Sequence, residues 1–325
     1  MSRAARPDLS IVPLEPSHAP AMAALVATRI GRLRERVPAL PAAWTEEPAL
    51  ARLVTELAVR GTGAAAYAAG RPVGFLAATV IDGHGGRWAY APDVGHAAEG
   101  VHAALVVEQL YGRLAQAWVR EAILEHVVTA LADDDATIST LARLGFGQTV
   151  VDLVRDLSPV AGPRPRGIEI RQAGPADTSA VVDLDLGLRR HLAGSPIFRR
   201  LGPPSPPELQ RRALGDPGGA TFLAEQGGRP LAFLRIGPSA TDVATIVRDP
   251  GTASITAAFT VPERRGGGIA RALLGAAISW AREAGYARTA VDHESANGEA
   301  YRFWARHFTP VAVSMTRRVA VRPAP

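Results

Sequence analysis

The sequence of 325 residues contains no cysteine and no lysine, and only 6% of it is aromatic. Without cysteine the chain can form no disulfide, no thiolate metal site and no cysteine nucleophile. All 36 residues counted as lysine or arginine are arginine, which gives a formal net charge of +5 and a pI of about 10.3. Because the arginines are scattered and no aromatic platform for stacking bases accompanies them, the charge does not indicate a nucleic-acid partner.

Long apolar runs are absent as well. No uncharged apolar stretch reaches the roughly 20 residues that a membrane-spanning helix needs, and the N-terminal residues contain no apolar signal core. We therefore expect a cytoplasmic protein with no membrane partner. The chain is 47% hydrophobic and 21% charged, as globular proteins are, and its length suffices for two domains.

Internal repetition is the main organising feature of the sequence. Residues 70–76 read GRPVGFL and residues 228–234 read GRPLAFL, an offset of 158 positions. Two further matches keep the same order at nearly the same offset: residues 9–11 and 16–18 match 168–170 and 175–177, and residues 141–146 match 304–308. Matches that keep both order and spacing indicate two copies of one fold.

A proline-rich segment separates the two copies. Residues 158–167 (SPVAGPRPRG) contain three prolines, which remove backbone donors and favour extended chain. We therefore predict a first domain over residues 1–157, a linker over 158–167 and a second domain over 168–325. The two domains would pack together as an intramolecular pseudo-dimer.

Strands and helices interleave in the second half. Gly227 and Gly228 separate two of the strands as a hairpin turn, and a helix begins near Asp177 or Thr178, either of which could cap it. The predicted strands cover 168–171, 220–224, 230–236, 254–261, 289–294 and 311–319, and further helices cover 207–214, 269–284 and 298–306. This order predicts an α+β fold in which a mixed sheet is flanked by helices.

The most informative stretch is residues 261–274, VPERRGGGIARALL, where a strand runs into three glycines and then into an amphipathic helix. Glycine allows positive φ and a close approach of the backbone to a ligand, and the free N–H groups of a helix N-terminus attract an anion. Arg265 and Arg271 add positive charge. A plain glycine turn is the alternative, and the spacing matches neither a dinucleotide-binding loop nor a P-loop. We favour a phosphate-binding loop.

These residues also carry a family resemblance. Residues 265–270, with the pattern RxxGxA, resemble motif A of the Gcn5-related N-acetyltransferases (GNAT superfamily), and residues 297–304, NxxAxxFW, resemble motif B. The resemblance covers nearly all of residues 168–321 and is weaker over the first half. It implies two tandem GNAT-like domains, each with a mixed, mostly antiparallel sheet whose central strands are splayed.

The resemblance also implies acetyl-coenzyme A (acetyl-CoA) as the cosubstrate and no metal. Backbone amides of the motif A loop would hold the pyrophosphate, and the strand that ends at 259–261 would hold the pantetheine arm and polarise the thioester carbonyl. The cofactor-binding residues that it implies are Phe259, Thr260, Val261, Arg265, Gly266, Gly267, Gly268, Ile269, Ala270, Arg271, Asn297 and Trp304.

In the family a neutral amine attacks acetyl-CoA directly, and many members use a tyrosine to protonate the leaving thiolate. Trp304 occupies the matching position here, so Tyr301, one helical turn earlier, is the candidate acid; an ordinary helix residue is the alternative. His293 and Glu294 are candidate bases at the end of a predicted strand. Side chains alternate along a strand, so at most one of the two faces the cleft directly. A water wire without a dedicated base is the remaining alternative.

The first half lacks the phosphate loop. After residues 91–93, where the second half has its arginine and glycines, the chain reads VGHAAEG, and Glu99 would repel a pyrophosphate. Leu141 matches Trp304, and His96 is a loop histidine without an evident partner. The acidic run 133–135 fits a helix N-terminus better than a metal site. We interpret residues 1–157 as a degenerate copy.

The expected function is an N-acetyltransferase that acts on the primary amine of a small molecule or peptide. One alternative is a non-catalytic coenzyme A-binding or regulatory module, which the missing tyrosine favours. The other is a scaffold that has lost ligand binding, which the intact loop disfavours. Residues 194–207 and 239–252 would shape the acceptor cleft, where Arg248 and Asp249 could orient a charged substrate or belong to a solvated hairpin.

Overall fold

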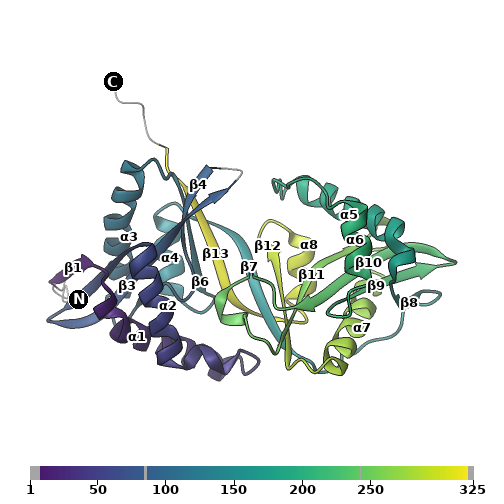
Figure 1. The fold of residues 1–325 in the computed structure, drawn as a ribbon, viewed down its shortest axis with the longest axis horizontal. Coiled ribbons are helices and arrows are strands. Elements are labelled where there is room, and N and C mark those ends of the chain that lie inside the picture. Colours follow the sequence, from purple (N-terminus) through teal and green to yellow (C-terminus); the bar gives the residue numbers. More distant parts are fainter. Residues whose placement is uncertain (1–7, 84–85, 242, 321–325) are drawn as a thin grey trace, which may run out of the picture. The chain divides into compact units, whose positions relative to one another are not determined.

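The computed structural model describes residues 8–83, 86–241 and 243–320, and its contacts divide them into two compact units (Figure 1). The first unit contains the described residues up to Val151, residues 244–246 and the described residues from Pro310 onward. The second unit contains the described residues of 152–243 and 247–309. Each unit is built around its own run of hydrogen-bonded strands.

The first unit carries a mixed sheet. Its elements are β1 (Leu9–Pro13), η1 (Pro16–His18), α1 (Ala19–Arg36), η2 (Ala42–Thr45), α2 (Glu47–Arg60), β2 (Thr62–Ala68), β3 (Arg71–Gly83), β4 (Gly86–Ala91), β5 (His96–Ala98), α3 (Ala103–Arg120), β6 (Glu125–Leu131), α4 (Asp135–Arg143), the first part of β7 (Gly147–Asp156) and most of β13 (Thr309–Arg318). Neighbouring strands follow the order β1-β2-β3-β4-β6-β13, with β5 also paired to β3. The β4–β6 pair is parallel and the others are antiparallel.

The second unit repeats this arrangement. Its elements are β8 (Glu169–Gln172), η3 (Pro175–Asp177), α5 (Thr178–Ala193), α6 (Pro207–Leu214), β9 (Ala220–Gln226), β10 (Arg229–Pro238), β11 (Thr252–Thr260), η5 (Pro262–Arg264), α7 (Ile269–Glu283), β12 (Arg288–Glu294) and α8 (Gly298–Trp304). The strand order is β8-β9-β10-β11-β12. Only the β11–β12 pair among these is parallel. The expected α+β fold, with two copies of a mixed, mostly antiparallel sheet, is therefore confirmed.

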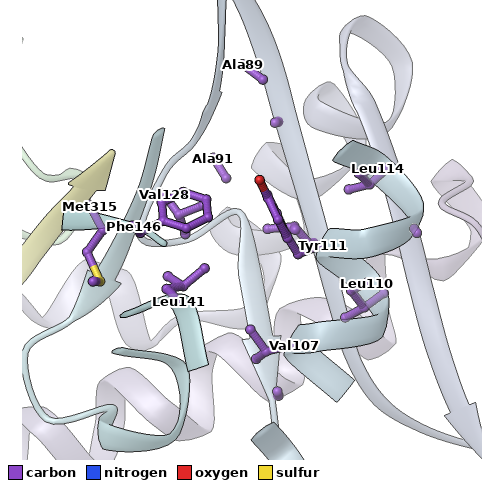
Figure 2. Close-up of a cluster of buried hydrophobic side chains, with 14 of the residues drawn as sticks. Ala89, Ala91, Val107, Leu110, Tyr111, Leu114, Val128, Leu141, Phe146 and Met315 are labelled. Carbon is purple, nitrogen blue, oxygen red and sulfur yellow. The ribbon is translucent and has the colours of Figure 1, made fainter. Parts of the chain in front are cut away.

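The last strand of the chain lies in the first unit. β13 pairs with β6, with Met315 opposite Val128, and Met315 packs into the same buried cluster as Tyr111 and Phe146 (Figure 2). The predicted second domain, 168–325, is thus not one compact unit, because its last strand completes the sheet of the other half. An alternating strand pattern indicates a strand but does not say which edge it will join.

The loop between β10 and β11 also contributes to the first unit. Residues 244–246 belong to that unit, and the N–H groups of Thr245 and Ile246 each donate to the Asp93 carboxylate at 2.8 Å. Burial of this carboxyl raises its pKa. The two charged residues of this loop, which we expected either to orient a substrate or to belong to a solvated hairpin, have partners within the protein. Arg248 donates to the Val243 carbonyl, and Asp249 pairs with Arg288.

The region 94–100 of the first unit differs from its sequence-based interpretation. Residues 96–98 form β5 against β3, with Ala97 opposite Phe75, just as Phe259 lies opposite Phe233 in the second unit. His96 is therefore a strand residue, buried, with Nε2 2.9 Å from the Thr129 carbonyl oxygen. The position that corresponds to the glycine loop is thus 99–102, between β5 and α3.

The elements predicted for the second half are confirmed within one to three residues, and α6 matches at both ends. Asp177 stands at the N-cap of α5 but makes no capping bond there. Its carboxylate instead pairs with Arg171 and accepts the Gly174 N–H. The Arg171 hydrogen bonds lower the pKa of Asp177 to about 2. Among the acidic run 133–135, Asp134 caps α4, as the sequence predicts.

Candidate functional site

The central strands of the second unit separate along their length. β11 and β12 pair only over Thr252–Ile255 and Arg288–Val291, although β11 continues to Thr260 and β12 to Glu294. On its other side β11 stays paired with β10 as far as Thr260. The register slips at Thr256, which has no partner on β10, and such a bulge turns the strand. The splayed strands expected from the sequence are therefore present, and they open the sheet at the C-terminal end of β11.

A cleft of about 670 Å³ occupies this opening, a volume within the usual range for small-ligand sites. It is lined by residues of α5, β10, β11, the glycine loop, α7 and α8. Its lining includes Leu188, His191, Phe259, Thr260, Arg265, Gly266, Gly268, Ala270, Arg271, Asn297, Glu299, Trp304 and His307.

The glycine loop delivers the start of α7 into this cleft. Gly266 and Gly268 have φ values of 78° and 82°, a left-handed conformation that other residues adopt only with strain. Gly268 is the N-cap of α7 and has no side chain to satisfy the first N–H groups of the helix. These N–H groups and the positive end of the helix dipole therefore form an anion site.

The charge of the cleft agrees with an anionic ligand. Arginines from the loop, α7 and α8 line it: Arg264, Arg265, Arg271, Arg302 and Arg306. Glu299 is the one carboxylate among the lining residues within the described chain. Burial, together with the nearby arginines, lowers the pKa of His307, so this imidazole is neutral at pH 7. The excess of fixed positive charge suits a ligand that carries phosphates.

Two arginines of the motif have partners that the sequence does not reveal. Arg265 donates from Nε to the Thr260 carbonyl at 3.0 Å, pairs with Glu299 and lies 5.6 Å from the Phe259 ring centre. Arg271 donates to the Pro163 carbonyl, and Ala161 lines the cleft. The segment 158–167 is therefore more than a spacer, because part of it forms one wall of the cleft.

Most of the predicted cofactor-binding residues meet at the cleft. Asn297 caps α8, with Oδ1 accepting the Ala300 N–H at 3.1 Å, and the buried Trp304 lies at the other end of that helix. Val261 and Gly267 do not line the cleft. The Val261 N–H donates to the Leu231 carbonyl, so this amide is not free for a pantetheine arm.

The three candidate catalytic residues lie outside the cleft lining. Glu294 forms an ion pair with Arg199. His293 is buried, with Nδ1 2.9 Å from the Glu294 carbonyl oxygen and its ring edge-on to Tyr301 at 6.1 Å. Tyr301 is 56% exposed. The structure thus groups these residues with one another rather than with the motif A loop.

Among the histidine and carboxylate side chains that line the cleft, sequence reasoning missed His191, Glu299 and His307. A signal existed for His191, since Leu184, Leu188 and His191 recur at helical spacing on one face of α5. Glu299 stands two residues after the Asn297 cap, in the first turn of α8. Neither signal identifies a cleft residue until α5 and α8 are placed against β11.

No group of three or more histidine, aspartate or glutamate side chains suited to a metal ion occurs among the described residues. Within the same part of the chain, no helix is both long enough and apolar enough to cross a membrane.

Comparison with known proteins agrees with this geometry. The sequence model of the Acetyltransferase (GNAT) family matches residues 190–308. A GCN5-related N-acetyltransferase from Sphaerobacter thermophilus superposes with a TM-score of 0.57 at 17% identity, over 97% of this chain and 98% of that one. A GCN5-related glucosamine N-acetyltransferase region of a fungal multi-domain β-N-acetylglucosaminidase gives 0.51 at 14% identity, over 97% of this chain and 39% of that one.

At such low identity the solved structures establish the fold alone, and no curated protein matches the sequence. The family match covers the glycine loop, β12 and α8. The first unit repeats the same order of elements. Residues 190–308 thus match the acetyltransferase (GNAT) family, and the chain as a whole has a tandem GNAT fold.

Proposed function

We propose that the second unit binds acetyl-CoA and transfers its acetyl group to a primary amine of a small molecule or peptide. One observation carries this proposal: the arginine-lined cleft begins at the bare N-terminus of α7 and continues along the edge of β11 where β12 has separated from it. A long ligand with phosphates at one end and a reactive group at the other suits such a cleft.

The residues present fit acetyl-CoA. The N–H groups of the glycine loop and of the first turn of α7 would hold its pyrophosphate. Arg271 and Arg306 would neutralise phosphate charge from either wall. Asn297 and Trp304 would border the pantetheine arm beside β11. When bound, acetyl-CoA supplies an activated acetyl thioester.

The chain itself contributes position and polarity. The edge of β11 beyond Ile255 is not paired with β12, so its backbone groups can fix the arm and hold the acetyl carbonyl in one orientation. Holding the amine and the thioester together removes most of the entropic cost of a bimolecular reaction. Backbone N–H donors at the carbonyl oxygen stabilise the charge that develops there.

We further propose that the first unit binds no acetyl-CoA and that the chain has one cofactor site. The connection between β5 and α3 is residues 99–102, whereas that between β11 and α7 is residues 261–268. The shorter connection carries Glu99 and has no run of glycines. It offers neither the backbone cradle nor the positive charge of the second unit.

A non-catalytic coenzyme A-binding module is the second candidate. It is favoured by Trp304, which lines the cleft at the position where the family resemblance leads us to expect a tyrosine. An indole N–H does not ionise, so it cannot serve as a general acid. An enzyme built this way would leave protonation of the thiolate to solvent.

Calorimetric titration with acetyl-CoA tests the proposal. We expect one site per chain, and we expect Gly268→Glu to abolish it because the new carboxylate would face the pyrophosphate. Gly100→Glu is the matched control, since Gly100 also has a positive φ, 80°, and precedes the corresponding helix of the first unit. A wild-type protein that does not bind acetyl-CoA would refute the proposal. Binding without turnover across a panel of amines would favour the non-catalytic module.

A further inference from the structure

The cleft reaches both faces of the second sheet. Phe259 points to the α5 side, where it packs with Val181 and Leu184, and a Cβ placed on Gly187 of α5 would lie 2.7 Å from its ring. The neighbouring residues Ala258 and Thr260 point to the opposite side, because side chains alternate along a strand. Figure 1 shows α5 and α6 on one side of this sheet and α7 on the other.

This arrangement separates two approaches to the free edge of β11. The glycine loop and the N-terminus of α7 supply the phosphate-binding groups, and α7 covers one face. The face under α5 is therefore left for the second substrate. The lining residues on that side include Leu188 and His191 of α5 and Phe259 of β11. His191 and Leu188 thus belong to the wall of the cleft on the α5 side.

His191 has an acidic neighbour across the cleft. Its Nε2 lies 3.9 Å from Glu299 Oε2, and its side chain is 28% exposed. This separation is too long for a direct hydrogen bond, but it places the carboxylate beside the Nε2 edge of the ring. The same oxygen of Glu299 also pairs with Arg265, which fixes the carboxylate from the loop side. On its own helix, the nearby Arg189 is turned to the Gly202 carbonyl.

We propose that His191 is the general base of acetyl transfer and that Glu299 is its positioning residue. The inference rests on the proposed function and extends it by one catalytic residue. In this proposal the proton of the neutral ring is on Nε2, the nitrogen nearer the carboxylate, and Nδ1 is the basic nitrogen. This relation between an imidazole and an orienting carboxylate is a recurrent catalytic device.

In the proposed step, the nitrogen lone pair of the amine attacks the thioester carbonyl carbon, and a C–N bond forms. As the C–S bond breaks, the electron pair leaves with sulfur as a thiolate. The proton lost from the amine nitrogen passes to Nδ1 of His191. The resulting imidazolium is stabilised by Glu299 and later returns its proton to solvent, and the thiolate takes a proton from water.

The other candidate bases are less well placed. His307 lines the cleft but faces Arg271 and Arg306, whose positive charge opposes proton uptake. His293 and Glu294 lie outside the lining, and Glu294 is held by Arg199. Glu299 itself is held in an ion pair with Arg265 of the glycine loop. Among the described residues that line the cleft, His191 is thus the histidine that has a carboxylate as its neighbour.

The first test is the pH dependence of kcat for the best amine of the panel, repeated with a second amine of different basicity. The acid limb of the profile is the decrease of kcat at low pH. If this limb reflects a group of the enzyme, its midpoint stays the same when the amine is changed. If it reflects the amine, its midpoint follows the basicity of the amine. We expect His191→Gln to lower kcat about 100-fold, to remove the enzyme limb and to leave acetyl-CoA affinity within about twofold. Glu299→Gln should lower kcat by less than His191→Gln does, because it removes the positioning residue and keeps the imidazole.

His307→Gln is the comparison for a cleft histidine without an acidic partner, and it should alter acetyl-CoA affinity while leaving the limb where the wild type has it. Proton NMR of the imidazole C–H resonances checks the contact between the two side chains without any acceptor. The resonance lost in His191→Gln should change its chemical shift in Glu299→Gln, because the carboxylate beside the ring is replaced. Wild-type turnover with an unchanged kcat and limb in His191→Gln would overturn the inference alone. A wild-type protein that does not bind acetyl-CoA would overturn it together with the proposed function.

Discussion

At one equivalent position of the fold, the two units carry different residues, which leave a cleft open in one unit and close it in the other. Arg29 and Leu188 each lie ten residues after the first residue of their helix, Ala19 and Thr178. Leu188 lines the cleft of the second unit. Arg29 is 8% exposed, donates to the His96 carbonyl at 2.7 Å and pairs with Asp134. An open wall in one unit is thus a filled, ion-paired core in the other.

The partner of Arg29 has its own counterpart. Asp134 and Asn297 both cap the helix that follows the parallel strand, and each accepts an N–H three residues ahead at 3.1 Å. The cavity beside His96 in the first unit measures about 10 Å³, against about 670 Å³ for the cleft of the second. Replacing a leucine and an asparagine by an arginine and an aspartate is a direct way to close such a cleft.

The difference shows how a duplicated fold can lose a ligand site and keep its stability. Burial lowers the pKa of Arg29, and Asp134, Glu99 and Asp93 oppose that effect. A buried guanidinium is tolerated only when it is paired and hydrogen-bonded. The first unit meets this condition with the Asp134 carboxylate, which also caps α4, and with the backbone carbonyl of His96 in β5. Its closed site therefore depends on all of them together.

Copying the pair of the first unit into the second should produce the largest effect. We expect Leu188→Arg combined with Asn297→Asp to reduce acetyl-CoA affinity more than about a thousandfold, or about 4 kcal/mol, because the ion pair would fill the cleft. Calorimetry measures the loss. Leu188→Met, which keeps an apolar side chain of similar volume, is the matched control. Tight binding of acetyl-CoA by the double variant would contradict the view that an arginine–aspartate pair at these positions closes the cleft.

Opening the first unit should cost stability. Arg29→Leu leaves Asp134 without its partner and should lower the free energy of unfolding by about 3 kcal/mol, measured by urea unfolding of the full chain. Adding Asp134→Asn removes the unpaired charge and should recover part of the loss. The number of acetyl-CoA sites should stay at one, since the glycine loop is still missing. A second site in the double variant would mean that the ion pair alone blocks the first unit.

The sequence predicted what depends on local pattern. The glycine loop, the hairpin at Gly227–Gly228 and the helix at 207–214 follow from residues next to one another, and the structure contains all three. The element order of the second half followed in the same way. The N-cap role of Asp134 was also local, since a cap and its N–H partner lie three residues apart.

The sequence did not predict what depends on distant pairing. Nothing in the alternation of residues 311–319 indicates that this strand would join β6, about 180 positions earlier. The cleft role of His191 depends on α5 packing against Phe259, and the pairing of Arg265 with Glu299 depends on α8 lying beside the loop. The candidates His293, Glu294 and Tyr301 were chosen by nearness along the chain to motif B, which does not determine nearness in space.

Acidic pH should destabilise the first unit through protonation of His96. Burial lowers the pKa of His96 to about 4, below the value of about 6.5 in an unfolded chain. The unfolded state therefore binds more protons between these two values, and stability falls as the pH is lowered through that window. We expect a loss of about 2 kcal/mol between pH 6.5 and pH 4. Hydrogen exchange of β5 and β6, measured by mass spectrometry, localises this loss to the first unit.

His96→Gln should flatten this dependence, because glutamine can still donate to the Thr129 carbonyl but does not titrate. His102→Gln, which removes a histidine at the N-cap of α3, should keep the wild-type slope. The raised pKa of Asp93 acts in the opposite direction, since a folded state that holds this proton gains stability as the pH falls. A slope in His96→Gln as steep as that of the wild type would assign the acid sensitivity to other groups.

The smallest expected effect distinguishes the N-cap of α8, Asn297, from the N-cap of α4, Asp134. Asn297→Ala removes one capping bond and should cost about 1 kcal/mol, seen as faster hydrogen exchange at the start of α8. Asp134→Ala removes the corresponding bond of α4 and also leaves Arg29 without its ion-pair partner. It should therefore lower the free energy of unfolding by more than Asn297→Ala does, and the difference is the contribution of the ion pair. Repeating both substitutions in an Arg29→Leu background completes a double-mutant cycle. If the comparison is right, the cost of Asp134→Ala falls there toward that of Asn297→Ala, because the arginine that pairs with Asp134 has been removed.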